Sequence, residues 1–151
     1  MPNLEDAILL AAQAHLGQKD KNGQPYILHP LRVMLRLESA RERIVGVLHD
    51  VIEDTPTTLD DLRARGYPED LVSAIDHMTR REDETYEQFT ERAASNPIAR
   101  RVKLADLEDN LDVRRLATVT PQDAERFQRY LTARKHIHAL IDAEDGLPPA
   151  E

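Results

Sequence analysis

The residues with the clearest potential for chemistry lie in one short segment, residues 43–54. This segment begins with apolar residues spaced as in a helix, and it then carries His49, Asp50, Glu53 and Asp54. Burying such groups is costly unless they are paired or bound to a metal. Glu53 lies one helical turn beyond His49 and therefore shares its face of the helix. We predict that this segment holds part of a divalent metal site with an acid–base group beside it.

A complete metal site would draw ligands from distant parts of the chain. Four side chains at helix starts or inside helices are the candidate ligands: His29, His49, Asp50 and Asp106. Two imidazoles and two carboxylates suit manganese, iron or zinc better than calcium or magnesium. A metal that accepts five or six ligands would keep places for water and a phosphate oxygen, and it would lower the pKa of that water. Glu53 and Asp54 are the nearby carboxylates able to move protons.

Composition and charge limit the classes of function that remain. The 151 residues are 40% hydrophobic and 32% charged, which is typical of one globular domain. The absence of cysteine excludes disulfides and zinc fingers, so any metal must be held by His and carboxylates. A net charge of −8 argues against a nucleic-acid surface but allows a small phosphorylated ligand. Neither a signal peptide nor a membrane-length apolar run is recognisable, so we expect a cytoplasmic protein without a membrane partner.

The periodicity of apolar residues predicts an all-α fold, a single helical bundle over residues 1–145 followed by a flexible tail, 146–151. Asn3 is placed to cap the first helix, and Pro30, Pro97 and Pro121 are each expected at the first position of a helix. The expected helices cover approximately residues 4–17, 29–39, 40–52, 59–65, 68–78, 86–93 and 97–110, with a long last helix from 121. In that last helix, the expected packing residues are Phe127, Leu131, Ile137 and Leu140.

Three separated motifs carry a resemblance to a known family. They are AHLGQKDKNGQPYILHPL at residues 14–31, LHDVIEDT at 48–55 and VKLADLEDN at 102–110. In this order and at these distances, the motifs resemble the hydrolase domain of the RelA/SpoT family, part of the HD superfamily of helical metal phosphohydrolases. The similarity covers roughly His15 to Leu116, and it is specific because a lone His-Asp pair would mean little.

The resemblance implies a function for particular residues. It places manganese on the four candidate ligands, the catalytic Glu-Asp pair on Glu53 and Asp54, and a substrate-contacting Asn on Asn110. The implied reaction is hydrolysis of the 3′-pyrophosphate of the nucleotide ppGpp to GDP and pyrophosphate. A chain of this length resembles the small members of the family that contain only the hydrolase domain.

The sequence departs from the family where the nucleotide is recognised. The loop position at which the family has an Arg that stacks on guanine is Asp20, and a carboxylate cannot supply cation–π stacking. The family's His-Asn is Asp109-Asn110, and its following Thr is Val113. Lys21 is either a phosphate contact or an ordinary loop charge. We therefore expect the metal and hydrolytic residues to persist while guanine recognition is altered.

Several alternatives remain open at this point. The domain could act on another nucleotide or phosphoester, or it could sense a nucleotide without turnover, although Glu53 and Asp54 argue against a sensor. A purely structural helical protein would carry no metal and would tolerate Asp50→Ala. Tyr86 and Phe89 are expected to pack rather than to stack on substrate, and His15 to support the site rather than bind metal. A homo-oligomer is compatible with the sequence.

Overall fold

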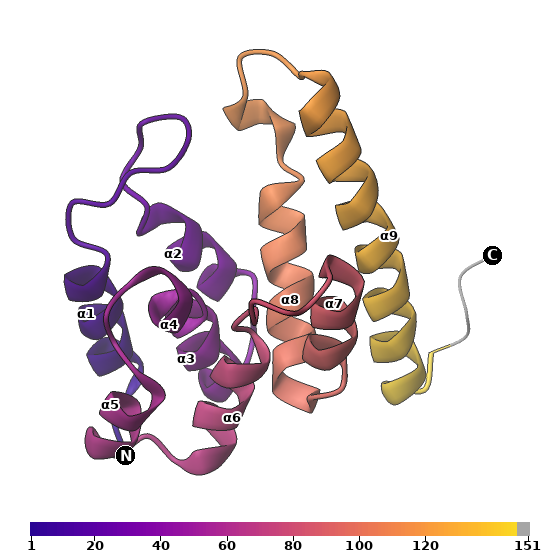
Figure 1. Ribbon diagram of the computed structural model, residues 1–151. Helices are drawn as coiled ribbons and strands as arrows, with labels where there is room; N and C mark the ends of the chain where they lie inside the picture. The colour runs from indigo at the N-terminus through magenta and orange to yellow at the C-terminus, as the bar shows by residue number, and fades with distance from the viewer. Residues whose placement is uncertain (148–151) are drawn as a thin grey trace.

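The computed structural model describes residues 1–147, and within them it contains helices and no strand, which confirms the all-α prediction (Figure 1). An isolated β-bridge joins Lys19 and Pro25 in the first loop. No helix in residues 1–147 is both long and apolar enough to span a bilayer. Most of the predicted tail, residues 146–151, lies outside the described residues. The elements are α1 (Leu4–Ala14), α2 (Leu28–Leu35), α3 (Ala40–Leu48), α4 (Val51–Asp54), α5 (Leu59–Ala64), α6 (Glu69–His77), α7 (Tyr86–Ala94), α8 (Pro97–Asn110), the 3₁₀-helix η1 (Val113–Arg115) and α9 (Pro121–Glu144).

Side-chain caps determine where most of these helices begin. Reciprocal capping boxes start α1, α5, α7 and α9 at Asn3, Thr58, Thr85 and Thr120. Asn96 caps α8 directly before Pro97. Each cap satisfies backbone amides that the first turn leaves free and contributes about 1 kcal/mol. The predicted starts at Asn3, Pro97 and Pro121 are therefore confirmed.

Two helix boundaries at the candidate site differ from the prediction, and the first two helices also end earlier than predicted, at Ala14 and Leu35. α2 begins at Leu28, so Pro30 is its third residue rather than its first. The helix expected over residues 40–52 is interrupted, because α3 ends at Leu48 and α4 starts at Val51. The ring of His49 explains the interruption: its Nδ1 lies 2.6 Å from the carbonyl oxygen of Gly46, which the amide of residue 50 would use in a continuing helix.

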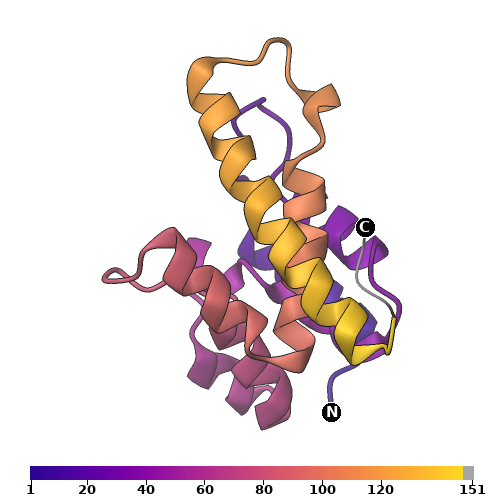
Figure 2. The same cartoon turned by 90° about the vertical axis from the view of Figure 1, so that its right-hand side faces the viewer.

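Two hydrophobic clusters share α8. The larger cluster is built from α1, α2, α3 and α6, and it receives Ala99, Val102 and Ala105 from α8. The smaller cluster joins Ala94, Leu107, Ala133, Ile137 and Ile141, so it contains residues of α7, α8 and α9. α8 and α9 run side by side as a long hairpin (Figure 2). α8 thus fixes the position of α9 relative to the rest of the bundle.

The buried face of α9 differs from the predicted one. Ile137 is fully buried as expected, but Leu131 and Leu140 are 51% and 37% exposed. Ala133 and Ile141, which lie four residues before and after Ile137, complete the buried stripe. The predicted face is wrong because the stripe that faces α8 runs through Ala133, Ile137 and Ile141, and Leu131 and Leu140 lie outside it.

Candidate metal centre and active site

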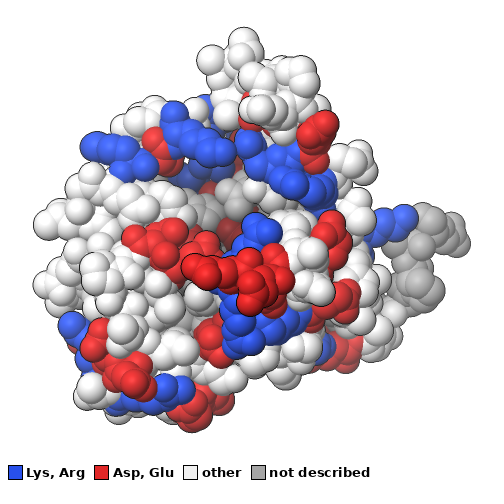
Figure 3. All heavy atoms as spheres, in the orientation of Figure 1, with Lys and Arg blue, Asp and Glu red and all other residues white. Residues whose placement is uncertain are grey.

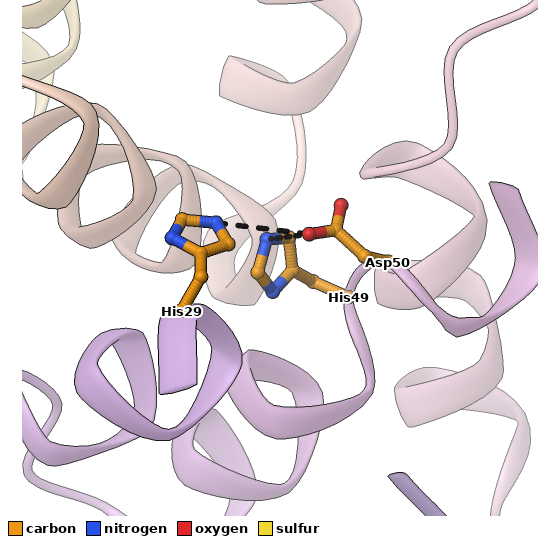
Figure 4. A group of neighbouring side chains, drawn as sticks. All are labelled: His29, His49 and Asp50. Carbon is orange, nitrogen blue, oxygen red and sulfur yellow. Dashed lines mark ion pairs between the residues drawn. The ribbon is translucent and has the colours of Figure 1, made fainter. Parts of the chain in front are cut away.

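Three segments bring the predicted ligands together. His29 lies in α2, His49 and Asp50 form the junction between α3 and α4, and Asp106 lies in α8. α3 packs against both α2 and α8, so these segments meet at the centre of the bundle. Figure 4 shows the His29 and His49 rings and the Asp50 carboxylate directed toward a common point.

The distances describe a tight cluster of potential ligand atoms. His29 Nε2 lies 3.7 Å from Asp50 Oδ2 and 3.0 Å from Asp106 Oδ1. His49 Nε2 lies 3.0 Å from Asp50 Oδ2 and 3.5 Å from Asp106 Oδ1. His29, His49 and Asp50 each offer one ligand atom, and these three atoms lie within 4.8 Å of one another. Each carboxylate therefore contacts both imidazoles through their Nε2 atoms.

The cluster fits a divalent metal on its own chemistry. Both Nδ1 atoms are occupied, that of His29 by Asp109 at 2.7 Å and that of His49 by Gly46 at 2.6 Å. His49 Nε2 is buried and has no hydrogen-bond partner within residues 1–147, although two carboxylate oxygens lie within 3.5 Å. An unsatisfied buried nitrogen is costly, and a cation beside two carboxylates would satisfy it. Two nitrogen and two oxygen donors therefore suit a transition metal.

Further polar groups hold the two carboxylates in place. Tyr26 donates its hydroxyl to Asp50 Oδ2 at 2.6 Å. Asp106 receives Asn110 Nδ2 at 3.1 Å on Oδ1 and Lys103 Nζ at 3.2 Å on Oδ2. Burial opposes ionisation of Asp106, but the Lys103 charge and the bonds from the imidazoles hold its pKa well below the usual range. Asp106 therefore stays ionised, with Oδ2 toward Lys103 and Oδ1 toward the two imidazoles and Asn110.

Glu53 and Asp54 lie beside Asp50 at the more exposed side of the cluster. Oxygen atoms of the three carboxylates lie within 4.8 Å of one another. Burial and the neighbouring charges of Asp50 and Asp54 raise the pKa of Glu53, and the amide of Arg80, which donates to its Oε1 at 2.8 Å, opposes this. Burial and the Asp50 charge also raise the pKa of Asp54. A carboxylate with a raised pKa next to a metal site is suited to accept a proton.

A cavity of about 530 Å³ opens over the cluster, which is a usual size for a small-molecule site. The same face of the molecule is hollowed, with Lys and Arg side chains above the hollow and Asp and Glu below it (Figure 3). Lys21 and Asn110 both line the cavity, as predicted for substrate contacts. Its other basic and aromatic residues are Lys19, Arg80, Lys103, Arg115, Arg126, Tyr26, Tyr86, Phe89, Phe127 and Tyr130.

Asp20 also lines the cavity, but its carboxylate is occupied within its own loop. Oδ1 accepts hydrogen bonds from the amides of Asn22 at 2.8 Å and Gln24 at 2.9 Å. The side chain thus stabilises the turn at Gly23. The position that departs from the family pattern serves here to shape the loop.

The comparison with known families agrees with this geometry. The profile of the HD domain family matches residues 7–120. The chain belongs to the HD domain family. This match covers α2, the α3–α4 junction and α8, which carry all four candidate ligands, and it ends just before α9.

Individual relatives of this HD domain are much longer proteins. A guanosine-3′,5′-bis(diphosphate) 3′-pyrophosphohydrolase of Aquifex aeolicus is 32% identical over 120 residues, 72% of this chain and 17% of that protein. A GTP pyrophosphokinase of Streptomyces coelicolor is 33% identical over 121 residues, 72% of this chain and 14% of that protein. The chain therefore spans less than a fifth of the length of either curated relative.

A solved structure confirms the fold of the HD domain. It belongs to a protein described in the words "A metazoan ortholog of SpoT hydrolyzes ppGpp and plays a role in starvation responses". The two structures match with a TM-score of 0.73 at 22% identity, over 91% of this chain and 86% of the other. The structural match extends into α9, because residues 1–120 alone are less than 91% of the chain.

Sequence reasoning missed several residues of this HD domain site. Arg126, Phe127 and Tyr130 reach the cavity only because α9 folds back along α8, and no local pattern predicts that return. Tyr86 and Phe89 were expected only to pack, but they also line the cavity, where Lys103 Nζ lies 4.6 Å from the Phe89 ring centre. Asp109 was noted only as a departure from the family, and the structure shows it bound to His29.

Proposed function

We propose that this HD domain is a metal-dependent phosphohydrolase that removes the 3′-pyrophosphate of ppGpp or a closely related nucleotide. Its metal ligands would be His29, His49, Asp50 and Asp106, and Mn²⁺ is the ion we expect, with iron or zinc as alternatives. The supporting observation is that two imidazole Nε2 atoms and two carboxylates converge below a cavity that has Glu53 and Asp54 at its side. The curated names of similar proteins support the choice of substrate.

The chain's own residues supply distinct parts of the reaction. A divalent metal bound there would lower the pKa of a water ligand and polarise a phosphate oxygen. Glu53 is placed to take the proton of the attacking water, because its raised pKa brings it closer to neutral pH. Asp54 lies beside it and can share that proton. Asn110 and Lys21 would hold the substrate from opposite segments of the cavity wall.

The remainder of the cavity suits a nucleotide. Basic side chains from the first loop, η1 and α9 can neutralise phosphates remote from the metal cluster. Aromatic rings of α7 and α9 offer apolar surface for a base. The net charge of −8 supports a small nucleotide rather than a nucleic acid as partner. The cytoplasmic location and a homo-oligomeric state stay predictions.

Elemental analysis joined to a substrate panel tests the proposal. The purified protein is expected to contain stoichiometric transition metal and to hydrolyse ppGpp faster than NADPH or nucleoside mono- and triphosphates in the presence of Mn²⁺. Glu53→Gln should lower kcat by about 10²–10⁴-fold while the metal content stays unchanged. Glu82→Gln, an exposed change of the same type in the loop before α7, is the matched control. Protein without metal and without turnover of any compound would contradict the proposal.

One observation favours a second candidate, hydrolysis of a different nucleotide or phosphoester. The loop residue that would stack on guanine in the family is Asp20, and its carboxylate binds the loop backbone. The same panel separates the candidates, since faster turnover of a non-guanine compound would favour the second. Tight ppGpp binding without product would instead indicate a nucleotide sensor.

A further inference from the structure

Asp109 is a fully buried carboxylate outside the proposed ligand and catalytic sets. It lies in the last turn of α8, and its side chain is 0% exposed. An isolated buried carboxylate would be strongly destabilising, so its partners indicate why it can be present. Those partners come from α2 and η1, the elements on either side of the end of α8.

The partners of Asp109 are one imidazole and two guanidinium groups. His29 Nδ1 lies 2.7 Å from Oδ2, and Arg32 donates from Nε to Oδ1 at 2.8 Å and from Nη2 to Oδ2 at 3.2 Å. Arg115 Nη2 donates to the backbone oxygen of Asp109 at 2.6 Å and lies 3.5 Å from Oδ2. Burial alone would raise the pKa of Asp109, but the bonds from His29 and Arg32 lower it to about 2. Arg32, whose guanidinium is always charged, donates to both oxygens, so the group it faces is an ionised carboxylate.

An ionised carboxylate fixes the proton of the neighbouring ring. Because it can only accept hydrogen bonds, the nitrogen that faces it, His29 Nδ1, must carry the hydrogen. A neutral ring with hydrogen on Nδ1 has its lone pair on Nε2, the atom that faces Asp50 and Asp106 and would bind a cation between them; without a cation, Nε2 can instead donate to Asp106 Oδ1 at 3.0 Å. His49 receives the same orientation from the backbone oxygen of Gly46. The two candidate ligand rings are thus oriented by different groups, and only the Asp109 side chain can be removed by mutation.

The same carboxylate connects the metal cluster to the cavity wall. Arg115 lines the cavity, and its Nη2 donates to the backbone oxygen of Asp109 at 2.6 Å and lies 3.5 Å from the carboxylate. Arg32 supplies a second positive charge, so Asp109 does not add an unbalanced negative charge near the acidic cluster. Removing the Asp109 side chain would therefore release the His29 ring, whereas Arg115 would lose an ion pair of 3.5 Å and keep its bond to the backbone oxygen.

We propose that Asp109 is a positioning residue that holds His29 in the tautomer with hydrogen on Nδ1, and thereby sets the metal affinity of the site. The inference rests on the proposed function only in taking His29 as a metal ligand. A carboxylate that orients a ligand imidazole typically contributes about 10–100-fold in metal affinity.

The tautomer can be read in the wild-type protein. In protein labelled with ¹⁵N-histidine and loaded with Zn²⁺, long-range ¹H–¹⁵N NMR is expected to show the His29 hydrogen on Nδ1, with His29→Gln used for assignment. Hydrogen on Nε2 of His29 would overturn the inference. This measurement needs no variant at Asp109, so it decides the matter even if such a variant fails to fold.

Two substitutions test whether Asp109 sets the metal affinity, which calorimetric titration with Mn²⁺ measures. Asp109→Leu removes the acceptor and should weaken binding by about 10–100-fold. Asp109→Asn keeps one oxygen that can accept from His29, so its affinity should be intermediate. Glu108→Gln is the matched control, because the adjacent carboxylate forms only long, partly exposed ion pairs with Arg36 and Arg134, and its affinity should stay within about twofold.

The outcomes separate this inference from the proposed function. Wild-type affinity in a folded Asp109→Leu protein would overturn the role of Asp109 and leave the proposed function intact. A wild-type protein that binds no Mn²⁺ at all would overturn the proposed function, and a hydrogen on His29 Nδ1 in the metal-free protein would still test the orienting role, which its absence would overturn.

Discussion

Replacing Lys103 by Met should destabilise the metal-free protein substantially. Lys103 is buried, and its Nζ lies 3.2 Å from Asp106 Oδ2. Removing one partner of a buried ion pair costs about 3–5 kcal/mol, because the other charge stays buried without compensation. Asp106 keeps its contacts with His29 and Asn110, so we expect the lower end, about 3 kcal/mol. Met conserves the aliphatic stem and can contact the rings of Phe89 and Tyr86, which limits the loss from packing.

Chemical unfolding followed by circular dichroism in the presence of a chelator measures this cost. For a domain of this size, a loss of about 3 kcal/mol corresponds to a fall in Tm of about 6–12 °C. Saturating Mn²⁺ should reduce the difference in the free energy of unfolding between Lys103→Met and the wild type. A divalent cation also neutralises Asp106, and it binds only the folded protein. By linkage, the Lys103→Met variant should therefore bind Mn²⁺ more tightly than the wild type.

The matched control is Lys135→Met, which changes an exposed lysine of α9 and should alter the free energy of unfolding by less than about 0.5 kcal/mol. If Lys103→Met is as stable as the wild type in chelator, the buried Asp106 carboxylate does not need the Lys103 ammonium group for its stability. The double variant Lys103→Met/Asp106→Asn should recover part of the loss, because it removes both charges together.

Three further predictions address turnover, packing and specificity. The pKa of Glu53 is raised above 4.5, and a base must be ionised to act, so turnover should fall as pH drops toward a midpoint above 4.5; a rate–pH profile checks this. Ile137→Ala should cost about 2–5 kcal/mol in urea unfolding because the side chain is fully buried, whereas Leu140→Ala should cost much less. Asp20→Arg should raise activity on guanosine 3′-pyrophosphates despite the loss of two turn hydrogen bonds, each worth about 1 kcal/mol. No change in an enzyme already efficient on ppGpp would contradict that last expectation.

The helices were predictable where local chemistry decides them. Asn3, Pro97 and Pro121 mark helix starts through caps and fixed backbone angles, and the structure confirms them. The interruption at His49 was not predictable, because it depends on a ring turning back to a carbonyl of the preceding turn.

The candidate site was predictable in its residue types but not in its surroundings. His29, His49, Asp50 and Asp106 were identified from residue chemistry and motif order, and the structure places them together. The partners that orient them depend on which helix faces which, so the bond between Asp109 and His29, 80 residues apart, has no local signal. The same holds for the contribution of α9 to the cavity.

The hairpin of α8 and α9 separates the proposed metal ligands from the part of the cavity wall that α9 supplies. Every proposed ligand lies before residue 107, whereas Arg126, Phe127 and Tyr130 stand on the outer helix beyond the region that the family profile covers. Exchanges on the cavity side of that outer helix could therefore retune which compound is accepted while the ion-holding centre stays untouched. For an engineer, α9 is the natural place to begin diversifying this scaffold.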